Sequence, residues 1–177
     1  PQYNHSTGMM VGAEALVRWK HPKRGLISPG IFIPVLEESK QIVELDFYVY
    51  ELTCGFIRRL IDEGVHVIPI STNFSRYDIF VDNFVERLEE IRNTYDVPVK
   101  YLRVELTETI AMKHEKEVNA IIEKLNASGY LVEMDDFGSG YSSVSYYENG
   151  VKKTARLTDG KVTLSVEAGK GLFVIPV

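Results

Sequence analysis

One stretch decides how the rest of the sequence is interpreted: Glu133-Met134-Asp135-Asp136-Phe137-Gly138-Ser139-Gly140-Tyr141-Ser142-Ser143. An apolar run leads into two adjacent carboxylates, Asp135 and Asp136, and a glycine-rich loop follows them. Gly138 and Gly140 permit the sharp backbone turn that such a joint needs. Because hard cations prefer carboxylate oxygens as ligands, this joint is a candidate metal site.

The Asp-Phe-Gly in this stretch also marks the magnesium-binding turn of protein kinases. The remaining sequence argues against that class, because no glycine-rich phosphate loop with a strand lysine and no His-Arg-Asp loop precede the turn. Three other acid or amide positions lie upstream, each associated with an apolar run: Glu14, Asn73 and Glu105. Together with Asp135 they form a series.

Glu14 is embedded in the apolar segment 9–19, which reads as a buried strand. Burying a carboxylate without a partner costs several kcal/mol. We therefore expect Glu14 to be paired, protonated or bound to a cation. The alternative is an edge strand that exposes this side chain to water.

The spacing of the series indicates the fold class. Asn73, Glu105 and Asp135 follow one another at intervals of about 31 residues, which matches one strand-helix unit of an eight-unit β/α barrel of about 250 residues. The carboxyl ends of parallel strands joined by helices all meet at one face. The sequence therefore predicts an α/β fold, a partial TIM-type (βα) barrel, in which the four side chains converge at the mouth.

Apolar periodicity predicts the elements of this barrel. We expect helices over 28–39, 43–63, 82–95 and 114–128, and strands over 9–19, 66–73 and 100–108 and from Leu131 into Asp135. In the strand 100–108, period-two alternation places Leu102, Val104 and Leu106 on one face and Arg103, Glu105 and Thr107 on the other. Residues 1–8 and 20–25 are predicted to be turns or loops.

Composition limits the classes of partner. A chain of 177 residues with 45% hydrophobic and 25% charged residues is typical of a globular protein with one substantial core. A net charge of -5 gives no basic surface for a nucleic-acid polymer. The single cysteine, Cys54, argues against a disulfide framework and fits a reducing compartment. Since no apolar run is long enough for a membrane span, we expect a cytoplasmic protein without a membrane segment.

Five ordered motifs resemble one known family, the EAL-domain phosphodiesterases, which hydrolyse the bacterial second messenger cyclic di-GMP. The resemblance covers roughly residues 1–147. The motifs are Glu14-Ala15-Leu16 within the segment 12–19, Ile33-Pro34-Val35-Leu36-Glu37, Thr72-Asn73-Phe74-Ser75, Glu105-Leu106-Thr107-Glu108, and the loop from Asp135 to Ser143.

The resemblance implies specific roles for these residues. It implies two Mg²⁺ or Mn²⁺ ions, with Glu14, Glu105 and Asp135 as the catalytic carboxylates. The implied metal ligands are Glu14, Asn73, Glu105, Asp135 and Asp136. Arg18 and Leu16 are implied to contact the substrate, with Arg18 on a phosphate, and Glu108 to support the loop that follows the aspartate pair.

The resemblance also implies partners. They are cyclic di-GMP itself, a second copy of the chain in a homodimer supported by the loop after the aspartates, and a sensor or cyclase domain on the N-terminal side. The implied setting is bacterial signal transduction.

The sequence departs from the family pattern after Tyr147. The family has a Lys-x-Asp strand, then a glutamate and a glutamine, and none of these is found there. Residues 148–177 instead carry an Asp-Gly turn at 159–160 flanked by alternating residues, a β-hairpin signal, and an apolar strand over 172–175. We therefore expect two parts, a partial barrel over 1–147 and a β-hairpin tail over 148–177.

These departures leave three interpretations. The first is an impaired phosphodiesterase, because loss of a positioned catalytic group commonly costs a factor of about 100 to 10,000 in rate. The second is an inactive module that binds cyclic di-GMP or a partner. The third is a truncated or fused fragment, since an eight-stranded barrel needs at least about 200 residues and the family's first strand would lie mostly before Pro1.

Overall fold

The computed structural model describes the chain except residues 5, 108–114, 136–142, 149–150, 157–172 and 177. Its centre is a five-stranded sheet in the order β1-β2-β5-β6-β7. Four strands are parallel: β2 (Met10–Ala15), β5 (Ile70–Phe74), β6 (Leu102–Thr107) and β7 (Leu131–Asp135). The short β1 (Gln2–Tyr3) pairs antiparallel with β2. The predicted partial β/α barrel is confirmed.

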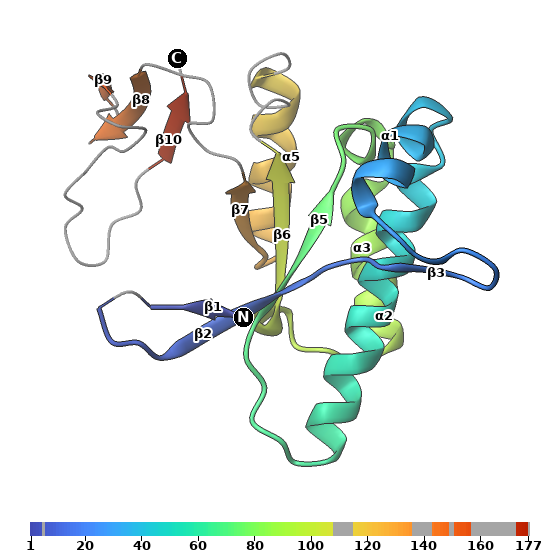
Figure 1. Cartoon of the computed structure of the whole chain (residues 1–177). Coiled ribbons are helices and arrows are strands. Elements are labelled where there is room, and N and C mark those ends of the chain that lie inside the picture. The colour runs from blue at the N-terminus through green and yellow to red at the C-terminus, as the bar shows by residue number, and fades with distance from the viewer. Residues whose placement is uncertain (5, 108–114, 136–142, 149–150, 157–172, 177) are drawn as a thin grey trace.

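Helices connect the parallel strands (Figure 1). One side of the sheet packs against α2 (Ile42–Asp62), α3 (Phe84–Thr94) and α5 (Glu115–Ala127), whereas α1 (Pro29–Glu38) packs against α2. Short 3-10 turns lie at η1 (Asp78–Phe80) and η2 (Val99–Tyr101). All four predicted helices are confirmed to within a few residues. Two predicted strands were too long, since β2 ends at Ala15 and β5 begins at Ile70.

The two faces of the sheet have opposite chemistry, as the alternation in β6 predicts. Leu102, Val104 and Leu106 are almost fully buried against the helices. The register pairs Arg103 with Ser71 and Glu105 with Asn73, so the polar side chains of neighbouring strands share the other face. We call this second face, which carries the site, the inner face.

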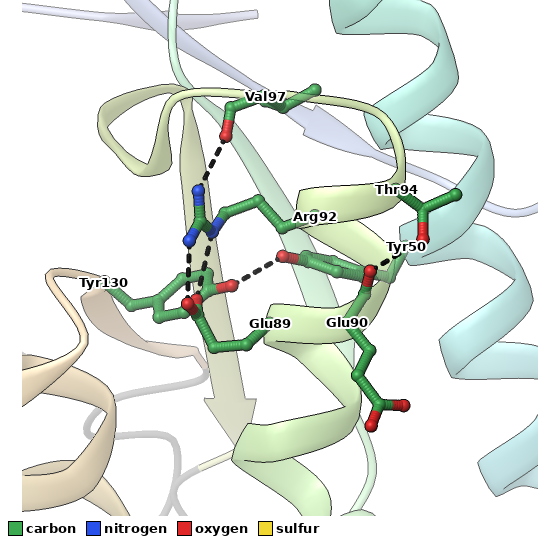
Figure 2. A network of polar contacts seen from close by, with 7 residues as sticks. All are labelled: Tyr50, Glu89, Glu90, Arg92, Thr94, Val97 and Tyr130. Atoms are coloured by element: carbon green, nitrogen blue, oxygen red, sulfur yellow. Dashed lines mark hydrogen bonds and ion pairs between the residues drawn. The ribbon is translucent and has the colours of Figure 1, made fainter.

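A partly buried polar cluster joins α2 and α3 to Tyr130, the residue before β7 (Figure 2). The Tyr50 and Tyr130 hydroxyls lie 2.9 Å apart, and burial raises the pKa of both. Arg92 binds both carboxylate oxygens of Glu89 and donates through Nη1 to the Val97 carbonyl at 3.1 Å. The Tyr50 hydroxyl thus holds Tyr130 directly before the strand that ends at Asp135.

Residues 20–25 do not form the predicted simple loop. They lie in a hairpin of β3 (Trp19–His21) and β4 (Gly25–Ile27). His21 holds the turn, because its Nδ1 accepts the backbone N–H groups of Lys23 and Arg24. The sequence did not predict this hairpin, because its turn residues are charged and polar and its strands are only three residues long.

The C-terminal segment forms a separate antiparallel sheet in the order β10-β8-β9. The strands are β8 (Ser143–Glu148), β9 (Val151–Arg156) and β10 (Phe173–Pro176). The apolar strand predicted near residue 172 is confirmed as β10. The β8–β9 hairpin, however, precedes the one predicted from the Asp-Gly turn, which lies outside the described residues.

Gly129 ends α5 in the left-handed conformation, at φ +88°. An added Cβ would lie 3.1 Å from Val99 Cγ1. Gly129→Ala should therefore lower the free energy of unfolding by about 1–2 kcal/mol in urea denaturation. The control is Gly30→Ala in α1, where a Cβ meets nothing closer than 3.8 Å and should cause little loss. Equal losses in both variants would contradict this role for Gly129.

Candidate functional site

The site is built on the carboxyl ends of β2 and β5. Glu14 and Ser71 are register partners, which places Asn73 two residues further toward the end of β5 on the same face. Asn73 Nδ2 donates to Glu14 Oε1 at 2.6 Å, and both side chains are half-buried. Glu14 is therefore paired, in agreement with the first of the two alternatives drawn from the sequence.

The next two strands continue this row. Glu105 on β6 is the register partner of Asn73 and is 9% exposed. Asp135 ends β7 and pairs in register with Thr107, two residues beyond Glu105. The backbone thus brings Glu14, Asn73 and Glu105 to the same end and the same face of three adjacent strands, and Asp135 ends the fourth strand beside them, as their spacing predicts.

This donor set fits Mg²⁺ or Mn²⁺, because it supplies hard carboxylate and amide oxygens from adjacent strands. Within the described residues, no three His, Cys, Asp or Glu side chains gather as a metal site. Glu14 and Glu105, together with the amide of Asn73, are the members of the implied set whose side chains the structure describes. The predicted ligand Asp136 and the loop residue Glu108 lie outside the described residues.

A cavity of about 270 Å³ lies beside the Glu14–Asn73 pair. Its lining includes Asn73 and the two residues that the family resemblance implies to contact the substrate, Leu16 and Arg18. Arg18 is exposed and donates through Nη1 to the Val17 carbonyl at 2.8 Å. The cavity therefore joins a cationic side chain to the edge of the candidate metal site.

Two carboxyl groups beside this cavity escaped the sequence analysis. Asp46 of α2 lines the cavity, and Asp78 in η1 is fully buried. Asp78 Oδ2 accepts the Ser75 backbone N–H at 2.6 Å and the Ser75 hydroxyl at 2.7 Å, and Asp46 Oδ2 accepts the same N–H at 3.1 Å. Burial, followed by the neighbouring Asp78 carboxylate, raises the pKa of Asp46 to about 9.

The raised pKa of Asp46 sets a pH dependence of stability. The folded protein retains a proton that the unfolded chain loses near 3.8, the ordinary pKa of an aspartate. This contribution is therefore complete at acidic pH and is lost as the pH rises toward about 9. Asp46→Asn resembles the protonated acid in shape and should remove the Asp46 share of this slope, while Asp78, whose pKa burial also raises, keeps its own share. At pH 8 we expect the variant to gain about 1–3 kcal/mol in urea unfolding.

Asp82→Asn is the matched control, because Asp82 is exposed. It should reproduce the wild-type dependence of unfolding free energy on pH between 5 and 9. An Asp46→Asn variant with the wild-type slope would show that Asp46 does not retain its proton in the folded protein.

Comparison with known proteins decides the family. A family model described as the EAL domain matches residues 1–150. This chain belongs to the EAL domain family. The match agrees with the resemblance inferred over residues 1–147, and the EAL domain here is a partial one.

Curated relatives of this EAL domain include two proteins of Pseudomonas aeruginosa. The bifunctional diguanylate cyclase/cyclic di-GMP phosphodiesterase MucR is 34% identical over 146 residues, which are 82% of this chain and 21% of MucR. The cyclic di-GMP phosphodiesterase PA2567 is 30% identical over 148 residues, covering 82% of this chain and 25% of that protein. This EAL chain thus spans about a quarter or less of their length.

Solved structures agree with the fold of this EAL domain. The MucR phosphodiesterase in complex with c-di-GMP superimposes with a TM-score of 0.72 at 35% identity, over 76% of this chain and 55% of that chain. The FimX EAL domain from Pseudomonas aeruginosa bound to c-di-GMP gives a TM-score of 0.65 at 16% identity, over 72% of this chain and 50% of that chain, and supports the fold alone.

The helices among the described residues are all too short or too polar to span a membrane.

Proposed function

We propose that this chain is the cation-binding and substrate-binding part of a phosphodiesterase that hydrolyses cyclic di-GMP to the linear dinucleotide. The observation that carries the proposal is the row of Glu14, Asn73, Glu105 and Asp135 across four adjacent strands. The similarity to MucR and PA2567, whose names state this activity, supports the same substrate. The working setting would be bacterial second-messenger signalling in the cytoplasm.

Glu14, Asn73, Glu105 and Asp135, with Asp136 beside them, would hold Mg²⁺ or Mn²⁺. When bound, such ions supply an activated water and neutralise phosphate charge. The Asn73 Nδ2–Glu14 Oε1 bond of 2.6 Å fixes two of these side chains relative to each other before a ligand arrives. Such fixed donors need little reorganisation during the reaction, which is the usual origin of electrostatic catalysis.

Arg18 would bind a substrate phosphate, since its guanidinium offers several N–H donors at the cavity beside Asn73. Glu37 lines the same cavity. A guanine base presents N–H donors along one edge, which suits a carboxylate acceptor. The cavity would therefore combine a contact for the phosphate with one for the base.

The experiment is incubation of the chain with cyclic di-GMP and Mn²⁺ or Mg²⁺, followed by chromatography for the linear dinucleotide. Circular dichroism first verifies that the sample is folded. Product that disappears when a chelator is added would support the proposal. A folded sample that neither binds cyclic di-GMP in equilibrium dialysis nor forms product would contradict it.

A second candidate is a module that binds cyclic di-GMP without turnover. The sequence after Tyr147 favours it, because the segment continues into β8 and β9 without the Lys-x-Asp strand of the family. In the same experiment, retention of cyclic di-GMP without linear product would decide for this candidate.

A further inference from the structure

Among the described residues, Glu133 is an acid on the inner face that neither the family motifs nor the proposed reaction uses. Glu133 on β7 is the register partner of Glu105, and Glu105 is the partner of Asn73. Adjacent strands lie about 5 Å apart, so Glu133 belongs to the same row as two implied metal ligands. Like charges directly opposite each other on neighbouring strands are destabilising. A carboxylate at this position therefore needs a compensating partner.

Arg103 and Ser71 supply that compensation. Arg103 Nη1 lies 2.8 Å from Glu133 Oε1, and the Ser71 hydroxyl donates to Glu133 Oε2. Both carboxylate oxygens are thus engaged. The ion pair is sheltered, with side-chain exposures of 17% for Arg103 and 26% for Glu133.

Arg103 is itself fixed from the opposite edge of the sheet. Nη1 also donates to Gln2 Oε1 at 3.1 Å, and Nη2 donates to the Val11 carbonyl at 3.4 Å. Gln2 Nε2 in turn donates to Ser71 Oγ at 3.4 Å. The guanidinium is therefore held by β1, β2 and β7, and it is not a mobile surface charge.

We propose that Arg103 is a positioning residue of the metal site, which binds Glu133 and so withholds a surplus carboxylate from the cation held by Glu14, Asn73, Glu105 and Asp135. The inference rests on the proposed metal site. Its physical basis is local charge: the Arg103–Glu133 pair is neutral as a unit, and either partner alone would add a full charge beside the site. Removing Arg103 should strengthen cation binding, and removing Glu133 should weaken it.

The test measures Mn²⁺ affinity by isothermal titration calorimetry on three variants. Arg103→Met should bind Mn²⁺ roughly tenfold more tightly than the wild type, and Glu133→Gln roughly five- to tenfold more weakly, as expected for a unit charge several ångströms from a divalent ion at partial exposure. The double variant Arg103→Met/Glu133→Gln should return to within about twofold of the wild type. Opposite changes in Mn²⁺ affinity that cancel in the double variant are expected when the two side chains act through their charges.

A merely structural role would give another pattern. Loss of packing would weaken Mn²⁺ binding in Arg103→Met and in the double variant alike, and that result would overturn the inference. The inference would also be overturned if the wild type and both single variants bound Mn²⁺ with the same affinity. That result would not contradict the metal site itself. No uptake by any of the four proteins would overturn both proposals. If circular dichroism shows that Arg103→Met does not fold, the test depends on Glu133→Gln, which should bind Mn²⁺ more weakly than the wild type.

Discussion

Replacing Glu14 with Gln should lower the Mn²⁺ affinity of this EAL domain by at least about tenfold. Removing even a residue that only supports a metal ligand commonly lowers metal affinity about 10- to 100-fold. The proposed hydrolysis of cyclic di-GMP should fall by a factor of about 100 or more. Gln keeps the length of the side chain and its Oε1 acceptor for Asn73 Nδ2, so the fold should persist. The measurements are calorimetric Mn²⁺ titration and chromatography of the linear dinucleotide.

The matched control for this experiment is Glu38→Gln, which removes the same charge from an exposed position at the end of α1. It should leave Mn²⁺ affinity and hydrolysis within about twofold of the wild type, since long-range charge is largely screened at physiological salt. Wild-type Mn²⁺ affinity in a folded Glu14→Gln variant would remove Glu14 from the ligand set.

The largest loss of stability is expected from Phe74→Ala. Phe74 is 1% exposed and contacts three aromatic rings, with centroid distances of 5.9 Å to Phe47, 5.9 Å to Tyr50 and 5.2 Å to Phe84. Truncating a buried Phe removes its transfer free energy and leaves a cavity, which costs about 3–5 kcal/mol. Urea denaturation followed by far-UV circular dichroism measures this loss.

Phe56→Ala provides the comparison, because Phe56 is 42% exposed on α2. Its loss should stay below about 1 kcal/mol, in the range of surface substitutions that remove one partial contact. If the two variants unfold at the same urea concentration, the ring cluster around Phe74 does not form the centre of the core.

The main architecture was predictable because two physical periodicities are explicit in the sequence. Alternation in the segment 100–108 identified the buried and polar faces of β6, and the structure buries Leu102, Val104 and Leu106 as expected. Intervals of one strand-helix unit placed Asn73, Glu105 and Asp135 at one end of the sheet. Each of these signals is local or repeats at a fixed distance along the chain.

Other features depend on contacts between distant segments. Asp46 appears in the sequence as an ordinary polar position in a helix, and only the fold brings it to Ser75 beside Asp78. The Arg103–Glu133 pair likewise requires the exact register of β6 and β7. The β3–β4 hairpin was missed because strands of three residues are too short to show a period.

Apolar and polar residues alternate along these strands. Packing and the proposed chemistry therefore constrain different positions of the same segments. Substitutions at Val104 or Leu106 should act on folding, whereas substitutions at Glu105 or Asn73 should act on the proposed metal site and leave the packing against the helices intact. Single point mutations at the polar positions could then change the proposed activity while the protein continues to fold. Family membership alone thus identifies the fold that the chain inherited. The role of each polar residue has to be tested by its own substitution.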